Sequence, residues 1–108
     1  MIRMRKDAVM TIDCKRNGTE VVFALGGKLD TNAAPELDAV VREQIVGAAK
    51  LIFDCTSLEF LSSAGLRVFL GAQKIMNRQG SMEFHHVGES VRDVFALTGM
   101  LDVFTVIS

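Results

Sequence analysis

Two adjacent serines, Ser62 and Ser63, stand where an apolar run is followed by a helical pattern, in the stretch D-C-T-S-L-E-F-L-S-S-A-G-L from Asp54 to Leu66. A hydroxyl at such a junction lies among backbone N–H groups without partners, in a field that favours negative charge. If Ser62 caps the helix, the Ser63 hydroxyl is free and faces outward. A phosphate there would add about −1.5 to −2 charges and accept hydrogen bonds from the helix N-terminus. The junction is therefore a candidate phosphorylation switch.

The same serines are poor candidates for a hydrolase nucleophile. A G-x-S-x-G elbow needs a glycine before the serine and a histidine base, and that glycine is missing. His85 and His86 are neighbours in an expected strand, so they should point to opposite faces and at most one could aim at any site. Two adjacent histidines without further ligands are also a weak metal signal. We expect no catalytic residue, no metal site and no enzyme.

Other polar patterns suggest no cofactor. Gly26-Gly27-Lys28 lacks the remaining glycine and the Ser/Thr of a phosphate-binding P-loop. Its glycines more simply let the backbone bend out of a sheet. Arg67, Lys74 and Arg78, with Gly71 between them, fall on one stripe of the helix after the serines. This basic stripe is either a solvated face or a partner contact.

Composition limits the class of protein. With 108 residues and 49% hydrophobic content, the chain 1–108 should form a single domain. Twelve Lys plus Arg against thirteen Asp plus Glu lack the basic excess of a nucleic-acid binder. Cys14 and Cys55, far apart and without metal spacing, are typical of reduced thiols. No signal peptide or membrane-length apolar run is visible, so we expect a soluble, cytoplasmic protein. We also expect a monomer or a weak dimer.

The first half of the chain predicts a hairpin followed by a helix. Val9 to Arg16 and Thr19 to Leu25 are candidate strands, and Asn17-Gly18 supplies two positive φ values for a tight turn between them. A polar loop follows at residues 30–32. Pro35 can open the next helix, and Gly47 ends it.

The second half alternates strands with helices. Residues 51–53 form a short buried strand, residues 54–63 a loop, and the serines begin a helix that Gly80 stops. The remaining elements are a strand at 82–87, a helix at 90–98 closed by Gly99 and a strand at 104–107. This order predicts an α/β fold, a mixed sheet with an N-terminal antiparallel hairpin and alternating helices on one face or both. The carboxyl ends of its strands are the expected functional edge.

At this point the sequence resembles the STAS domains, and among them the stand-alone anti-sigma factor antagonists of bacteria. Residues 60–67, F-L-S-S-A-G-L-R, are similar to the family signature at the start of a helix. Gly27-Lys28-Leu29-Asp30 resembles the G-x-L-D loop, and residues 91–101 resemble the final helix and turn. The three blocks occur in the family's order and span essentially the whole chain.

The resemblance implies partner switching in transcription regulation. The unphosphorylated protein would bind an anti-sigma factor that is also a serine kinase, phosphorylation would break the complex, and a phosphatase would restore it. Aligned by motif, the phosphorylated residue is Ser63, flanked by Ser62 and Ala64 where the family often has Asp and Ser. The residues expected to contact the partner are Asp30, Thr31, Asn32, Ser62, Gly65, Leu66 and Arg67. The alternative is a scaffold subunit of a transporter or stress complex that is never phosphorylated.

Overall fold

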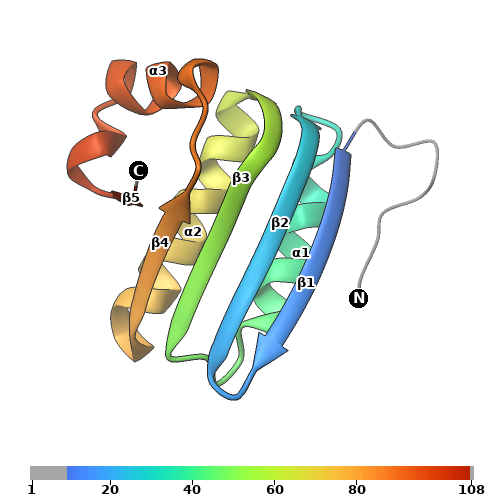
Figure 1. The fold of residues 1–108 in the computed structure, drawn as a ribbon, viewed down its shortest axis with the longest axis vertical. Helices are drawn as coiled ribbons and strands as arrows, with labels where there is room; N and C mark the ends of the chain where they lie inside the picture. The colour runs from blue at the N-terminus through green and yellow to red at the C-terminus, as the bar shows by residue number, and fades with distance from the viewer. Residues whose placement is uncertain (1–9, 108) are drawn as a thin grey trace.

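The computed structural model describes residues 10–107, which form a mixed sheet with helices packed against it (Figure 1). The five strands lie in chain order, with β1 and β2 antiparallel and β2 to β5 parallel. The expected mixed sheet with an opening hairpin is therefore confirmed. The elements are β1 (Met10–Asn17), β2 (Glu20–Leu29), α1 (Ala34–Gln44), β3 (Lys50–Leu61), α2 (Ser63–Gln79), β4 (Ser81–His85), α3 (Glu89–Leu97), the 3₁₀ turn η1 (Met100–Asp102) and β5 (Thr105–Ile107).

The hairpin forms one residue later than the sequence indicated. Asn17 is still paired, with Glu20, so the two turn residues are Gly18 and Thr19. Only Gly18 takes a positive φ, of 63°. A glycine in the first of two central positions is the type II′ arrangement, which also suits the twist of paired strands. Val9, expected in the first strand, lies outside the described residues.

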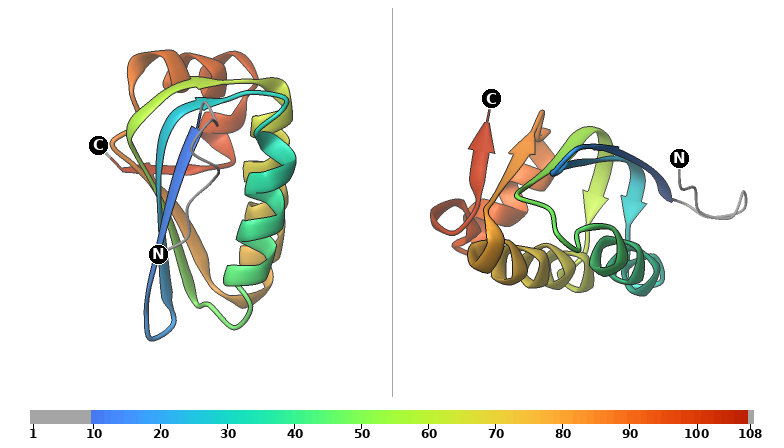
Figure 2. Two further views of the ribbon diagram at one scale, coloured as in Figure 1. Left: turned by 90° about the vertical axis from the view of Figure 1, so that its right-hand side faces the viewer. Right: turned by 90° about the horizontal axis from the view of Figure 1, so that it is seen from below.

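Helices α1 and α2 lie side by side on one face of the sheet (Figure 2). Pro35 stands in the first turn of α1, as expected, and the chain leaves this helix through Gly47 at a φ of 77°. Arg16 from the hairpin donates hydrogen bonds to the carbonyl oxygens of Gln44 and Val46, at 2.9 and 3.2 Å. Those carbonyls follow the last turn of α1, where a cation is favourable.

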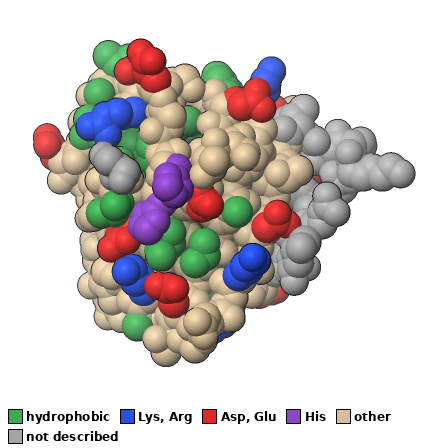
Figure 3. Space-filling view, in the orientation of Figure 1, with side chains coloured by type: hydrophobic (Ala, Val, Ile, Leu, Met, Phe, Trp, Pro, Cys, Tyr) green, Lys and Arg blue, Asp and Glu red, His purple; other side chains and the backbone are tan. Residues whose placement is uncertain are grey.

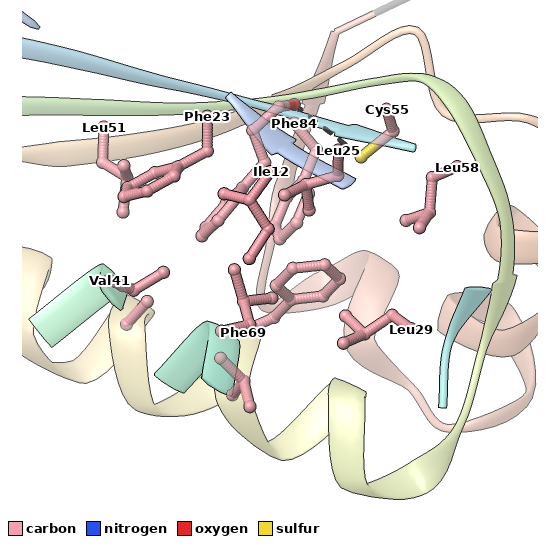
Figure 4. Close-up of a cluster of buried hydrophobic side chains, with 14 of the residues drawn as sticks. Ile12, Phe23, Leu25, Leu29, Val41, Leu51, Cys55, Leu58, Phe69 and Phe84 are labelled. Carbon is pink, nitrogen blue, oxygen red and sulfur yellow. Dashed lines mark hydrogen bonds between the residues drawn. The ribbon is translucent and has the colours of Figure 1, made fainter. Parts of the chain in front are cut away.

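The core lies between the sheet and these helices (Figure 4). Phe23, Phe53 and Phe84 occupy one row across β2, β3 and β4, with ring centroids 5.7 and 5.4 Å apart. Phe69 rises from α2 to within 4.9 Å of Phe53 and Phe84, and Phe95 of α3 lies 5.1 Å from Phe84. These rings are fully buried, and their tilted contacts add to the hydrophobic gain.

Two expectations about the carboxyl-terminal parts of β2 and β3 are wrong. Gly26 and Gly27 do not take the backbone out of the sheet, because β2 continues to Leu29. A Cβ at Gly26 would lie 2.7 Å from the Thr11 hydroxyl, so a larger residue there would require the Thr11 side chain to move. Residues 54–61 are not a loop either, because β3 runs to Leu61 and pairs with β2 to its end. The pairing register between β2 and β3 shifts beside Gly26 and Gly27, and these shifts let the two strands stay paired to their ends.

The cysteines are unpaired thiols, as expected, and both are buried. Burial raises the pKa of the Cys55 thiol to about 12, and the nearby Asp54 carboxylate adds to that effect. Burial also raises the pKa of Cys14. At neutral pH both side chains therefore behave as small apolar groups with little thiolate character.

Among residues 10–107 no helix lies on the second face of the sheet, which faces the viewer in Figure 3. Its central row holds Val22, Ile52 and Glu83, register neighbours on β2, β3 and β4. Ile52 is 9% exposed, although it lies on this face between Val22 and Glu83. Polar groups surround these apolar side chains, so this open face is mixed rather than a broad apolar patch.

The two histidines differ from expectation. His85 ends β4, but His86 follows it at a φ of 57°, outside the strand, so strand alternation does not separate the two rings. Their centroids lie 6.2 Å apart. The Nε2 atom of His85 lies 2.8 Å from a carboxylate oxygen of Glu83, and Lys50 lies 3.5 Å from the other oxygen. The hydrogen bond with His85, helped by Lys50, lowers the pKa of Glu83.

Candidate functional site

Ser62 and Ser63 divide the helix start between them. Ser62 is the N-cap of α2, with extended backbone, and its hydroxyl oxygen accepts a hydrogen bond from the Gly65 N–H at 3.1 Å. Its own N–H donates to the carbonyl of Leu29 at 2.9 Å, which ties the cap to the end of β2. Ser63 is the first helical residue and is exposed. Its hydroxyl therefore stands at the helix N-terminus, accessible from solvent.

A tight contact under the first turn of α2 fixes the height of the serines above the sheet. A Cβ on Gly65 would lie 2.5 Å from Cγ of Leu29 and 2.8 Å from Cδ1 of Leu61. Glycine alone allows α2 to begin this close to the ends of β2 and β3. Gly65 is buried, so its part in the site is to position Ser63 rather than to present a surface.

The loop that follows β2 lies beside this helix start. Leu29 and Leu61 are register neighbours, so Asp30 and Ser62 leave the sheet at adjacent points. The Asp30 carboxylate accepts a hydrogen bond from the Ala33 N–H at 2.8 Å, and its carbonyl accepts one from the Ala34 N–H at 3.0 Å. Asp30 thus shapes the entry to α1.

A shallow groove of about 410 Å³ separates the first turns of α1 and α2. Thr31 is exposed at its α1 side, and Arg67 is exposed at its α2 side. Asp38 and Arg42 pair across one turn of α1 at 3.0 Å and form part of the floor. The other lining residues are Ala34, Pro35, Ala64 and Val68.

Most of the residues expected at the site are brought together, at different depths. Asp30, Thr31, Asn32, Ser62 and Ser63 occupy two adjoining chain segments at one end of the sheet. Leu66 is half-buried and packs against the core, and Arg67 is exposed one turn after Ser63. Lys74 and Arg78 lie further along α2, beside a separate shallow groove.

Sequence reasoning missed one exposed pair at this end of the molecule. Phe60 is 47% exposed at the end of β3, and its register neighbour on β2 is the exposed Lys28. Phe60 fell within residues 54–63, which were predicted to be a loop, so neither its strand pairing nor its exposure was predicted. A possible signal was the polar Lys28 in the G-x-L-D block, since neighbours in parallel strands point to one face.

The Asp54 carboxylate, in the middle of β3, is held by groups of its own strand. Asp54, where the regular part of β3 ends, accepts hydrogen bonds from the Thr56 hydroxyl at 2.6 Å and the Thr56 N–H at 3.1 Å. The Thr56 hydroxyl is the main cause that lowers the pKa of Asp54, and the two histidines assist. Among residues 10–107, no group of three or more His, Cys, Asp or Glu is arranged to hold a metal ion.

Comparison with known proteins decides the family. A model of the STAS domain matches residues 11–108. The chain belongs to the STAS domain family. The anti-sigma-B factor antagonist of Bacillus subtilis is similar to this STAS chain, with 28% identity over 102 residues, 90% of each protein. No helix in the described part of this STAS chain is long and apolar enough to cross a membrane.

Solved structures confirm the STAS fold. An anti-sigma factor antagonist from Mycobacterium paratuberculosis superposes with a TM-score of 0.83 at 21% identity, covering 94% of this chain and 87% of that one. The Bacillus cell fate determinant SpoIIAA in its phosphorylated form superposes with a TM-score of 0.72 at 21% identity, covering 90% and 91%. At this level of identity the likeness concerns the fold.

Proposed function

We propose that this single-domain chain is a cytoplasmic anti-sigma factor antagonist that phosphorylation of Ser63 switches off. The observation that carries the proposal is the division of the serine pair, in which Ser62 is used as the cap and Ser63 is left exposed in the first helical turn. The antagonist named among its relatives and the phosphorylated form of SpoIIAA support it. The chain acts as a substrate and binding partner and is no enzyme itself.

The partner is an anti-sigma factor that is also a serine kinase. It binds the exposed surface around Ser63, which includes Thr31, Asn32 and Arg67. A phosphate at Ser63 brings about two negative charges into that interface. Because about 1.4 kcal/mol changes affinity roughly tenfold, a modest repulsion is enough to release the partner. The helix N-terminus accommodates the phosphate, so the antagonist stays folded in the released state.

The test uses the intact chain, a candidate anti-sigma kinase and ATP. We expect phosphate on the peptide that contains Ser63, located by mass spectrometry, and none after Ser63→Ala. The Ser62→Ala variant should still be labelled, because the cap is not the acceptor. A phosphatase should remove the label and restore binding of the kinase. Absence of label on the chain, while a known antagonist is labelled in parallel, would support the scaffold function instead.

A further inference from the structure

Phe60 is far more exposed to solvent than the other six phenylalanines. Of seven phenylalanines, six are 4% exposed or less and contact one another in the core. Phe60 is 47% exposed and has no ring partner among the described residues. A half-exposed aromatic side chain contributes only part of its hydrophobic gain to folding. Its remaining surface is available to another molecule.

Two cations belong to the elements that meet at this end of the sheet, Lys28 on β2 and Arg67 on α2. Lys28 is the register neighbour of Phe60, one residue before Leu29, whose carbonyl accepts the Ser62 N–H. Arg67 follows Ser63 by one helical turn. Within residues 10–107 neither cation forms a side-chain hydrogen bond or ion pair, and both are exposed. The Asp30 carboxylate nearby is already engaged with the Ala33 N–H.

We propose that Phe60 and Lys28 form the anchor through which this chain binds its protein partner, and that the partner presents an apolar pocket with carboxylates at its rim. Aromatic side chains are enriched at the centre of protein interfaces and charged groups at the rim, so Phe60 supplies the apolar anchor and Lys28 a charge at its edge. Phe60 precedes Ser63 by three residues and Lys28 precedes Asp30 by two, on paired strand ends, so this inference rests on the proposed function and deepens it. An acidic rim also agrees with the direction of the switch, because a phosphate on Ser63, one helical turn before Arg67, repels the carboxylates that the cations attract.

The decisive experiment measures affinity of the unphosphorylated chain for the anti-sigma kinase that labels Ser63, by titration calorimetry. We expect Phe60→Ala to weaken binding by about tenfold or more, in the range of an anchor residue. Lys28→Glu should weaken it as well, and the loss should shrink at high salt. The matched control is Val46→Ala, because Val46 is 72% exposed but lies beside Arg16 at the hairpin end. This control should bind as the wild type does.

A second charge variant tests the sign of the partner's rim. Glu59 is exposed next to Phe60, so Glu59→Gln removes a negative charge from the same surface without inserting a positive one. Binding of Glu59→Gln should be at least as tight as that of the wild type. Weaker binding of Glu59→Gln, with Lys28→Glu tighter, would mean a basic rim and would overturn the charge assignment.

Each outcome bears on one proposal or the other. A wild-type chain that binds and is phosphorylated, with Phe60→Ala binding equally well, overturns the anchor and leaves the proposed function intact. A wild-type chain that neither binds nor is labelled by any anti-sigma kinase contradicts the proposed function, and the anchor falls with it. Circular dichroism and thermal melting of Phe60→Ala verify the fold, and a Phe60→Leu variant that regains part of the affinity confirms an apolar pocket.

Discussion

The two halves of the β2–β3 pair behave differently. From Glu20–Lys50 to Ala24–Asp54 the register is continuous and the inward side chains fill the core. Beyond Ala24 the register shifts twice, and exposed side chains replace strict alternation on β3. Both halves contribute buried residues, and the irregular half also carries exposed side chains and leads into the helix start at Ser63.

The largest effect is expected in the regular half. Phe53 is fully buried and contacts three other rings, so Phe53→Ala should destabilise the chain by about 3–5 kcal/mol. Urea unfolding followed by circular dichroism measures this loss. Phe60→Ala, in the irregular half, serves as the comparison and should cost much less. Similar losses for the two variants would remove the distinction between the halves.

The next prediction concerns the close contact of Gly65 with Leu29 and Leu61 in the first turn of α2. Gly65→Ala places a methyl group against Leu29 and Leu61, and it should destabilise the chain by about 1–3 kcal/mol. Gly71→Ala, in the same helix, meets only the end of the Arg42 side chain at 3.4 Å. It should be neutral or stabilise by up to about 1 kcal/mol. Thermal melting of both variants checks the difference, and equal shifts would contradict a packing role for Gly65.

Substitutions of Ser62 and Ser63 should differ in how much they destabilise the fold. Ser62→Ala removes the cap that accepts the Gly65 N–H and should cost about 1 kcal/mol. Ser63→Ala removes an exposed hydroxyl and should change stability by less than about 0.5 kcal/mol. Denaturant unfolding of the two single variants measures both. A larger loss for Ser63→Ala would mean that the roles assigned to the two hydroxyls are reversed.

The smallest effect lies where the two halves meet, at Asp54. Because its pKa is lowered in the folded chain, Asp54 stabilises the fold above the ordinary pKa of an aspartate. That contribution is lost as the pH falls through the folded value, below about pH 4. Thr56→Val removes the main cause and should raise the pKa of Asp54, as measured by NMR titration. The stability difference between Thr56→Val and wild type should then be present at pH 7 and shrink toward pH 3.

Periodicity in the sequence predicted the helices and the regular half of the sheet. Helical spacing, and alternation on β1 and β2, reflect burial on a single face, whereas residues 51–53 of β3, all buried, were predicted from their continuous apolar run rather than from alternation. Alternation fails in residues 55–61 of β3, where Cys55, Leu58 and Leu61 are buried three residues apart, a pattern that strand periodicity does not contain. Phe60 was missed for the same reason. The left-handed backbone at His86 depends on the chain's exit from β4 toward α3, which no local pattern announced.

The serine cap was predictable because its signal is local. A serine before a helical pattern needs only its own first turn to form a hydrogen bond, and Ser62 does so with Gly65. The neighbouring surface was predictable only in part. Asp30 and Thr31 followed from the family resemblance, whereas the pairing of Lys28 with Phe60 depends on the shifted register between two strands.

The strand order has a consequence for handedness. Each parallel strand from β3 to β5 is added on the same side of the previous one, and crossovers between parallel strands are almost always right-handed. Successive right-handed crossovers in one direction must all pass over the same face. The bare face of this sheet, with Val22 and Ile52 at its centre, is therefore imposed by the path of the chain, and its side chains must suit water or another molecule.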